Sequence, residues 1–563
     1  MKFITLSLLQ IITLSVLVVQ PLNACERSEE LQREVVQQEV INASISNFRE
    51  EIPLLINREE CLLLQFDLDF KNYSNYKVET IKINFSGTTD PKDLESAKLI
   101  YVGDSQTSSV NRQFGKIEHG ASILEFTDNL LLSNPTASFR LMVKLKSNTN
   151  LLHRINAFCE SVSTDVGTLV CNDPNLGLGL RVGIALRQHG DDNVDTYRIP
   201  GLATTKNGTL LGIYDVRRDK SRDLQGDIDI GVSRSTDGGN TWEPMHIALD
   251  RGTWGNLPEK FNGISDACIL VDDNTNTIFV AGLWMYGVLD EDGKWIEGLT
   301  ENSSDWNHQW RDKGSQPGFD EKQTSQFLIT KSTDDGLTWS EPENLTRMCK
   351  QEDWWLWAPA PGHGITLKDG TLVFPTQGRN KNGTPFSNIT WSRDGGKTWK
   401  TSNPASSETT ENMIVELNDG SVMLNARDNK NRGNISVENG RNIHVTNDLG
   451  ETWTTHPTSH NALIEPTCMA SIHRHFFPEN GETKSILIFS NPNSKTSRDH
   501  MTIKVSLDDG MTWPEKYWIL LDAGKGRGYS CLTSIDEQTI GILYEGSQAD
   551  MVFQKISLSE LLD

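Results

Sequence analysis

One short pattern recurs five times in the last two-thirds of this 563-residue chain. Each copy reads Ser/Thr-x-Asp-x-Gly-x-Thr-Trp, and the five aspartates are Asp237, Asp334, Asp394, Asp448 and Asp508. A recurring unit of this kind indicates a repeat architecture. Within one copy the Asp can accept backbone N–H groups across a turn, the Gly supplies a position with φ > 0, and the Thr-Trp pair returns to strand. We therefore interpret these boxes as structural hairpin turns that carry no chemistry.

A second regularity, independent of the boxes, runs from residue 181 onward, where apolar segments are mirrored about short turns. Ile199–Leu202 and Leu210–Tyr214, for example, flank Asn207-Gly208, and five further mirrored pairs follow. Each mirrored pair predicts a β-hairpin. Each of the first five is followed by one box, and the sixth only by Met551–Ser557. Six inner and five outer hairpins predict a six-bladed β-propeller, whose sixth blade is completed by Val182–Leu186.

The region before the predicted propeller has a different pattern. Alternating segments such as Leu62–Phe70, Val78–Phe85 and Phe139–Leu145 predict an all-β domain, a sandwich, over residues 51–178. No acid, base or metal constellation stands out in it, so a carbohydrate-binding role and a spacer role both stay open. Residues 25–50 are polar and predict a tether or a short helix. The expected fold class is all-β, with the sandwich preceding a propeller over residues 180–563.

Residues 1–24 predict export. Lys2 is followed by an apolar run from Phe3 to Val19 and then by Leu22–Cys25, which is typical of an export signal and short for a membrane-spanning helix. The Leu22–Cys25 segment also resembles a bacterial lipobox, in which Cys25 becomes a lipidated N-terminus, although Asn23 is not a favoured residue there. Plain cleavage and lipidation at Cys25 both stay open. We expect a periplasmic or cell-surface protein.

Charge and composition exclude several classes of partner and cofactor. The formal net charge is −23 and no basic run occurs, which argues against a nucleic-acid partner. Only Cys159 and Cys171 of the eight cysteines lie close in sequence, so the chain is not a disulfide scaffold. The histidines show no spacing typical of a zinc site, and the glycines at 524, 526 and 528 do not fit a phosphate loop. We expect a monomer with no metal and no cofactor.

Reflection about the hairpin turns predicts which side chains share one end of a blade. Three pairs of polar residues are equidistant from their turns: Arg198 and Arg217, Glu411 and Arg427, and Tyr529 and Glu545. Cross-strand partners lie about 5 Å apart, so each pair is expected to meet at the open end of its hairpin. In a propeller these ends converge on one mouth around the axis. The sequence therefore predicts a single polar cluster that is rich in arginine.

At this point the chain resembles a known family. Tyr197–Pro200 is similar to its Arg-Ile-Pro motif, Asn425–Arg427 to its second-arginine motif, and Tyr529–Leu532 to its Tyr-Ser-x-Leu motif, while Arg498 precedes the fifth box. On these residues, about 180–563 resembles the bacterial exo-α-sialidases, glycoside hydrolases with a six-bladed Asp-box propeller. The N-terminal region is similar to the β-sandwich that precedes the propeller in some of these enzymes.

The resemblance implies a substrate clamp of three arginines: Arg198, Arg427 and Arg498. Sialic acid carries a carboxylate on its anomeric carbon, so its recognition requires planar, permanently charged, bidentate donors. For the same reason a neutral Tyr529 phenol can approach that carbon without the repulsion that a carboxylate would meet. A free Tyr has a pKa near 10, and the match to the family assigns Glu411 as its base. Sialidases with a Tyr nucleophile are a known exception to the two-carboxylate rule of glycosidases.

The remaining implied roles concern the leaving group and the sugar ring. The resemblance assigns protonation of the leaving oxygen, and later activation of water, to Asp223 in the loop after the first hairpin. Three nearby carboxylates compete for this role: Asp219, Asp227 and Asp229. Arg217 and Asp266 are expected to line the pocket near the ring substituents. Two further lining candidates stand at open ends of blades two and three: Trp284 and Gln377.

We therefore expect an exo-α-sialidase that releases terminal sialic acids from glycoproteins, glycolipids and oligosaccharides with retention of configuration. Two alternatives stay open. A sialic-acid-binding propeller without catalysis would need the arginines but neither Asp223 nor Tyr529. A trans-sialidase would share the donor-site motifs and differ only in its loops, which include the Trp-rich insertion Trp295–Phe319.

Overall fold

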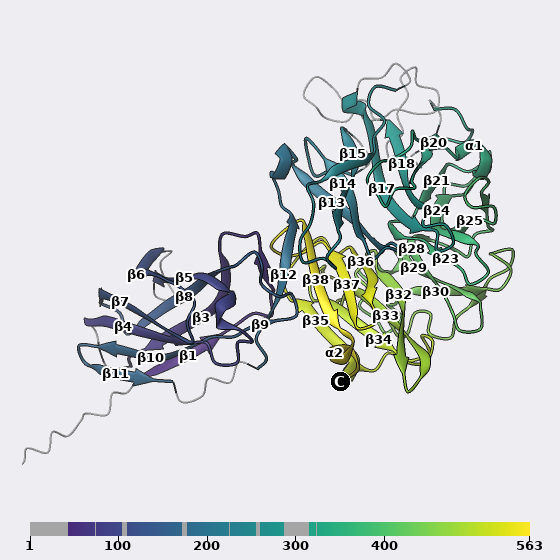
Figure 1. The fold of residues 1–563 in the computed structure, drawn as a ribbon. Helices are drawn as coiled ribbons and strands as arrows, with labels where there is room; N and C mark the ends of the chain where they lie inside the picture. Colours follow the sequence, from purple (N-terminus) through teal and green to yellow (C-terminus); the bar gives the residue numbers. More distant parts are fainter. Residues whose placement is uncertain are drawn as a thin grey trace, which may run out of the picture. The chain divides into compact units, whose positions relative to one another are not determined.

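The computed structural model describes residues 43–71, 73, 75–103, 110–171, 177–223, 226–254, 259–286, 315–321 and 324–563. The expected export signal with Cys25, most of the expected tether and most of Trp295–Phe319 lie outside these ranges. The described chain is built of strands, with two short α-helices, α1 (Thr346–Cys349) and α2 (Leu558–Leu562). No helix within these ranges is long and apolar enough to cross a membrane. The predicted all-β class is confirmed (Figure 1).

Two antiparallel sheets form the predicted N-terminal sandwich (Figure 1). One sheet has the order β1 (Ser44–Phe48), β3 (Cys61–Asp69), β8 (Thr136–Leu145), β5 (Leu94–Gly103) and β6 (Arg112–Glu118). The other has the order β11 (Gly167–Val170), β10 (Phe158–Thr164), β4 (Tyr76–Asn84) and β7 (Ile123–Leu132). Strand β1 corrects the sequence prediction, because these five residues were expected within the tether. Its exposed and half-buried residues alternate, as they do in an edge strand with one face toward a core.

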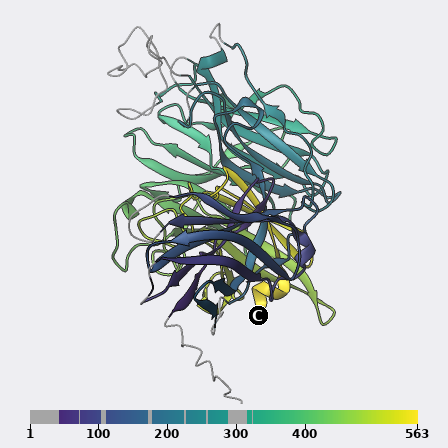
Figure 2. The ribbon, with the colours of Figure 1, turned by 90° about the vertical axis from the view of Figure 1, so that its left-hand side faces the viewer.

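Six further sheets form the propeller, coloured from blue to yellow in Figures 1 and 2. Blade 1 consists of β13 (Thr196–Thr204), β14 (Leu210–Arg217), β15 (Ile228–Ser235) and β16 (His246–Leu249). Blade 2 consists of β17 (Asn262–Val271), β18 (Ile278–Tyr286), β19 (Gln326–Ser332) and β20 (Glu343–Asn344), with β22 (Gly362–His363) beside β17. Blade 3 consists of β21 (Leu356–Pro359), β23 (Ile365–Thr366), β24 (Leu372–Arg379), β25 (Pro385–Ser392), β26 (Lys400–Thr401) and β27 (Ser406–Ser407).

The other three blades follow the same plan. Blade 4 consists of β28 (Thr409–Glu416), β29 (Val422–Asp428), β30 (Asn442–Thr446) and β31 (Thr454–Thr455). Blade 5 consists of β32 (Ser471–Glu479), β33 (Glu482–Pro492), β34 (Met501–Ser506) and β35 (Trp518–Asp522). Blade 6 consists of β36 (Ser530–Asp536), β37 (Thr539–Tyr544), β38 (Met551–Ser557) and β12 (Leu180–Arg187), which β2 (Leu54–Ile56) and β9 (Arg154–Ile155) extend.

The ring is closed by strands from opposite ends of the chain. Strand β12 pairs antiparallel with β38, with Ile184 opposite Phe553, and the two lie side by side in Figure 1. The innermost strand of blade 1, β13, contacts those of blades 2 and 6, β17 and β36. The predicted completion of the sixth blade by Val182–Leu186 is confirmed. A closed ring of blades leaves only short, protected sheet edges.

The boxes are turns, as predicted, and the first shows how they work. Ser235 Oγ and Thr241 N donate to Asp237 Oδ1 at 2.8 and 2.9 Å, while Gly239 N donates to Ser235 Oγ at 2.9 Å. A Cβ on Gly239, which has φ = 85°, would collide with Phe553 of blade 6. The same glycine of each later box faces the preceding blade: Gly336 meets Leu211, Gly396 meets Phe279, Gly450 meets Ser402 and Gly510 meets Met423. The boxes therefore fasten each blade to its neighbour.

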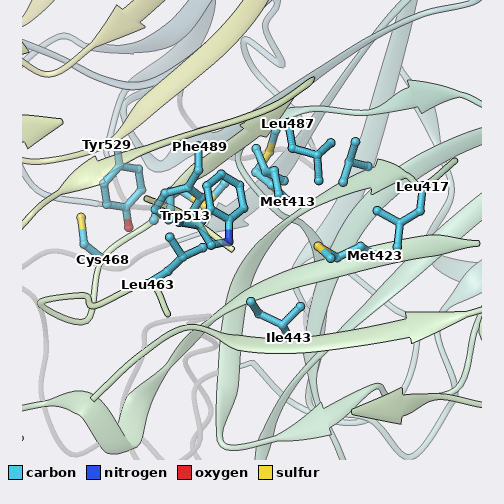
Figure 3. Close-up of a cluster of buried hydrophobic side chains, with 14 of the residues drawn as sticks. Met413, Leu417, Met423, Ile443, Leu463, Cys468, Leu487, Phe489, Trp513 and Tyr529 are labelled. Carbon is cyan, nitrogen blue, oxygen red and sulfur yellow. The ribbon is translucent and has the colours of Figure 1, made fainter. Parts of the chain in front are cut away.

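Apolar clusters fill the spaces between blades. One of them joins Met413 and Met423 of blade 4, Leu487 and Phe489 of blade 5, and Tyr529, which immediately precedes blade 6. Figure 3 shows Tyr529 at one end of this cluster, on the side of Cys468. These close contacts hold the aromatic ring of Tyr529 in place.

Candidate active site

The innermost strands present their polar residues through irregular backbone. The register of β13 shifts between Arg198 and Gly201, and Ile199 within this bulge has φ = 62°. A positive φ at a β-branched residue costs on the order of 1–3 kcal/mol. Ile199 is buried and its N–H donates to Glu545 Oε1 at 3.1 Å, so the surrounding contacts maintain this conformation. Asp266 has φ = 58° in a similar bulge of β17. Bulges of this kind re-aim side chains next to active sites.

The bulge corrects one pairing predicted by reflection. Arg198 lies opposite Asp215, whereas Arg217 lies opposite Thr196. Two shifts cause this difference. The hairpin is centred on Asn207 rather than between Asn207 and Gly208, and the bulge then moves the register by one further residue. Arg198 and Arg217 still lie near each other, because both contact Asp223.

Tyr529, Glu411 and Arg427 form a closed triangle. The Tyr529 hydroxyl donates to Glu411 Oε1, and Arg427 Nη1 donates to Glu411 Oε2 at 2.6 Å and to the Tyr529 oxygen at 3.1 Å. Burial, followed by the charge of Glu411, raises the pKa of Tyr529 well above its usual value. The phenol is therefore neutral and already hydrogen-bonded to a carboxylate that can take its proton.

Two more arginines lie against the Tyr529 ring. The guanidinium carbons of Arg198 and Arg498 lie 5.4 and 5.5 Å from the ring centroid. Each is fixed by the protein: Arg198 by Glu545, and Arg498 by the carbonyl oxygens of Arg527 and Thr467 at 2.9 and 3.2 Å. Together with Arg427, these residues place three permanent cations around one phenol.

Asp223 lies at the Arg198 side of this group. Its Oδ1 forms an ion pair with Arg217 Nη1 and lies 3.8 Å from Arg198 Nη1, while its side chain stays 63% exposed. Desolvation works against its charge, but the Arg217 and Arg198 cations outweigh it and hold the pKa of Asp223 below its usual value. Among the competing carboxylates, Asp229 and Asp227 pair with Arg218, and Asp219 is exposed. Asp223 is thus the carboxylate of this loop that reaches the arginines of the mouth.

Arg217 and Asp266 complete the cluster. Arg217 is fully buried, with its guanidinium between Asp215 and Asp223. Burial, then the nearby charges of Glu411, Asp215 and Asp223, raise the pKa of Asp266 well above its usual value. The raised pKa favours the protonated form of Asp266, and a protonated carboxyl can donate a hydrogen bond to a ligand. The structure brings together all eight residues predicted for the site: Arg198, Arg217, Asp223, Asp266, Glu411, Arg427, Arg498 and Tyr529.

Comparisons with known proteins identify the family to which the chain belongs. Residues 42–168 match the N-terminal domain of BNR-repeat neuraminidase, and residues 199–514 match the BNR repeat-like domain. Over 554 residues the chain is 38% identical to a sialidase of Bacteroides fragilis, covering 93% of this chain and 96% of the relative. The chain belongs to the bacterial sialidase family. A solved Hadza microbial sialidase superposes with a TM-score of 0.80 at 34% identity, covering 92% of this chain and 99% of its own.

A more distant relative matches only part of this chain. A sialidase of Micromonospora viridifaciens is 32% identical over 372 residues, which are 64% of this chain and 51% of that protein. The present chain therefore spans about half the length of this second relative, whereas it matches nearly the whole of the Bacteroides sialidase.

In this sialidase, two carboxylates matter more than the sequence indicated. Glu545 was identified only as the cross-strand partner of Tyr529, yet its carboxylate binds Arg198 and accepts the Tyr529 N–H at 3.0 Å. Burial alone would raise the pKa of Glu545, but the Arg198 cation outweighs it and keeps the pKa below its usual value. Reflection about the Asp536-Glu537 turn found Glu545, but its contact with Arg198 of blade 1 is visible only in the folded chain. Asp215, which holds Arg217, gave no motif signal.

The two additional lining candidates have structural contacts. Trp284 is 1% exposed and its indole N–H donates to Asn262 Oδ1 at 3.1 Å, while Gln377 donates to the Pro359 carbonyl at 3.3 Å. Both side chains are tied to their own sheets.

A separate cavity of about 430 Å³ opens near the closed ends of the inner hairpins, where His363 and His473 line it. The eight predicted site residues do not line this cavity. Within the described ranges, no group of three or more His, Cys, Asp or Glu side chains is arranged to hold a metal ion.

Proposed function

We propose that this protein is an exo-α-sialidase that hydrolyses terminal α-linked sialic acids from glycoproteins, glycolipids and oligosaccharides, with retention of configuration and with Tyr529 as the nucleophile. One observation carries the proposal: the Tyr529 hydroxyl donates to Glu411 inside a ring of three arginines. Membership of the sialidase family supports the class of reaction.

The arginines suit the carboxylate of a sialic acid. Arg198, Arg427 and Arg498 are each anchored by a carboxylate or by backbone carbonyls before any ligand arrives. Planar guanidinium groups held in this way bind a carboxylate at little further cost in side-chain order. Binding there brings the anomeric carbon, which bears the carboxylate, close to the Tyr529 oxygen.

In the first half-reaction the Tyr529 oxygen attacks the anomeric carbon, and its proton passes to Glu411 along the hydrogen bond already present. The glycosidic C–O bond breaks, and the leaving oxygen takes a proton from Asp223. In the second half-reaction water attacks the anomeric carbon and gives a proton to Asp223. The bond to Tyr529 breaks, and its oxygen takes the proton back from Glu411. Two inversions give net retention.

The substrate itself helps to prepare Asp223. Although desolvation favours its protonated form, the cations of Arg217 and Arg198 keep the pKa of Asp223 below its usual value. The first half-reaction needs this residue protonated. A bound carboxylate partly neutralises the arginines, which weakens their hold on the Asp223 anion and raises its pKa. Acid catalysis is therefore favoured when a sialoside occupies the clamp.

The first sugar product distinguishes this proposal from its alternatives. Proton NMR of a sialyllactose digest should show the α-anomer of free sialic acid before it equilibrates. A β-anomer formed first would contradict retention, and an anhydro-sugar or a sialylated acceptor would make the protein a trans-sialidase. Binding of the sialoside without turnover would make it a sialic-acid-binding propeller.

We further propose that the enzyme acts outside the cytoplasm, in the periplasm or at the cell surface. The support for this proposal is the signal-like pattern of residues 1–24 and the lipobox-like segment Leu22–Cys25.

A further inference from the structure

Arg217 is fully buried and is shared by two carboxylates. Asp215 Oδ2 accepts its Nε at 3.2 Å and its Nη2 at 2.8 Å, whereas its Nη1 faces Asp223 Oδ1 and the Ser221 carbonyl at 2.8 Å. A planar guanidinium bound along two edges cannot rotate without losing one set of contacts. The position of Asp223 is therefore coupled to that of Asp215 through Arg217.

Asp215 is itself held from a neighbouring blade. It is 0% exposed, lies on β14 of blade 1 and accepts the hydroxyl of Ser265 on β17 of blade 2. Its other oxygen, Oδ1, is buried with no hydrogen-bond partner among the described residues. A buried carboxylate is costly unless it is paired, and the cation that pairs with Asp215 is Arg217.

The charges show what that role would be. Without Asp215, the Arg217 cation would face Asp223 as its main counter-ion and would hold the Asp223 anion more tightly. With Asp215 present, part of the Arg217 field is already compensated, so less work is needed to place a proton on Asp223.

We propose that Asp215 is a positioning residue for proton transfer by Asp223: it fixes one edge of Arg217 and shares its charge, so that Asp223 is oriented but can still carry a proton. This inference rests on the proposed sialidase function. It deepens that function, because the protonation of poor leaving groups by Asp223 would then depend on Asp215, a buried aspartate that does not touch the reacting atoms.

Several other charged groups lie near Asp215, Arg217 and Asp223, and each contributes to the pH dependence of activity. Arg198 and Arg498 act on Asp223, and Asp266 of blade 2 lies close to both Asp215 and Asp223. Burial raises the pKa of Asp215 to about 6. Asp215 therefore loses its charge as the pH falls through about 6, which weakens its hold on Arg217. Replacing Asp215 by Asn should remove this contribution to the acid limb of activity.

The test compares two leaving groups in the full-length protein. An aryl α-sialoside with an acidic phenol needs little help from an acid, whereas sialyllactose, in whichever linkage the wild type cleaves faster, needs it fully. For Asp215→Asn we expect kcat/KM on sialyllactose to fall about tenfold to a hundredfold further than on the aryl sialoside, as part of the roughly 10²–10⁴-fold that a general acid supplies. The alkaline limb for sialyllactose should also move to lower pH, because Asp223 loses its proton earlier.

Matched variants control for folding. Asp229→Asn removes a buried carboxylate of the same blade that pairs with Arg218, the residue next to Arg217, and should leave the ratio between substrates unchanged. Asp215→Glu should bring the ratio of kcat/KM on sialyllactose to kcat/KM on the aryl sialoside part of the way back to the wild-type value. Should Asp215→Asn fail to fold in a thermal unfolding test, Ser265→Ala, which removes only the hydroxyl donor to Asp215, should shift the ratio in the same direction to a smaller extent.

The inference would be overturned if Asp215→Asn lowered kcat/KM equally on both substrates and left the alkaline limb of the pH profile for sialyllactose in place. It would also be overturned if Asp215→Asn behaved like the wild type, or if Ser265→Ala left the ratio of the two kcat/KM values unchanged. Absence of hydrolysis of either sialoside by the wild type would instead refute the proposed function.

Discussion

Each key arginine of the site has an anionic or carbonyl partner before substrate arrives. Arg198 contacts Glu545, Arg217 contacts Asp215 and Asp223, and Arg427 contacts Glu411, while Arg498 contacts two carbonyl oxygens. Pairing lowers the cost of keeping such cations away from water. It also orients the remaining N–H groups in advance, which is how preorganised polar sites stabilise developing charge.

Asp266 offers a prediction at the scale of one residue. Its raised pKa means that the folded protein retains a proton there that the unfolded chain releases near pH 4. The wild type should therefore lose stability relative to Asp266→Asn as the pH rises, by up to about 1.4 kcal/mol per pH unit until Asp266 ionises. Denaturant unfolding of both proteins from pH 4 to 8 measures this difference. A constant difference would show that Asp266 is charged throughout.

The same variant tests the role of Asp266 in binding. Because Asn is neutral and carries N–H donors, Asp266→Asn should keep KM for an aryl sialoside within about threefold of the wild type at pH 7, whereas Asp266→Ala should raise it by about tenfold, the value of one hydrogen bond of roughly 1.4 kcal/mol. A large increase in KM for both variants would indicate that the ionised carboxylate binds substrate.

At the scale of elements, the boxes act as fasteners between blades, and adjacent glycines in the third box permit a matched test. Gly396 has φ = 81° and a Cβ there would meet the Phe279 ring, whereas Gly395 has φ = 71° with nothing within 4 Å. Both Gly→Ala variants incur backbone strain. Gly396→Ala should cost about 1–3 kcal/mol more than Gly395→Ala, because it also overpacks the blade interface. Equal urea midpoints for the two would contradict this fastening role.

Much of the element order could be predicted from the sequence, because box and hairpin turns depend on local residues. Asn207-Gly208 and Asp419-Gly420 mark their hairpins directly, and the unpaired Met551–Ser557 indicated that β12 must return to close the ring. The bulges at Ile199 and Asp266 could not be predicted in this way. Their positive φ values depend on tertiary contacts such as the Glu545 hydrogen bond.

The functional side chains also fall into two groups: those that the sequence predicted and those that only the folded chain shows. Arg198, Arg427 and Tyr529 stand in recognisable motifs, so the sequence predicted them. Asp215 stands in an ordinary strand, and its importance follows from its burial against Arg217, which only the folded chain shows. Trp284 illustrates the converse, because its place at an open strand end favoured a binding role while its ring lies in an apolar cluster.

For the whole molecule, the N-terminus provides a separate prediction. If Leu22–Cys25 acts as a lipobox, labelled palmitate should enter the wild-type protein in a bacterial host and should not enter Cys25→Ala. Label in both proteins would exclude Cys25 as the site of attachment. Export without any label would indicate plain signal cleavage.

The central claim for the whole molecule is that its blades converge to make Tyr529 the nucleophile. The most direct measurement is mass spectrometry of the protein after brief treatment with a fluorinated sialosyl fluoride, which slows the second half-reaction. The account predicts one sialosyl adduct, located on the peptide that contains Tyr529 and absent from Tyr529→Phe. An adduct on Asp223 or Glu411, with Tyr529 unmodified, would contradict it.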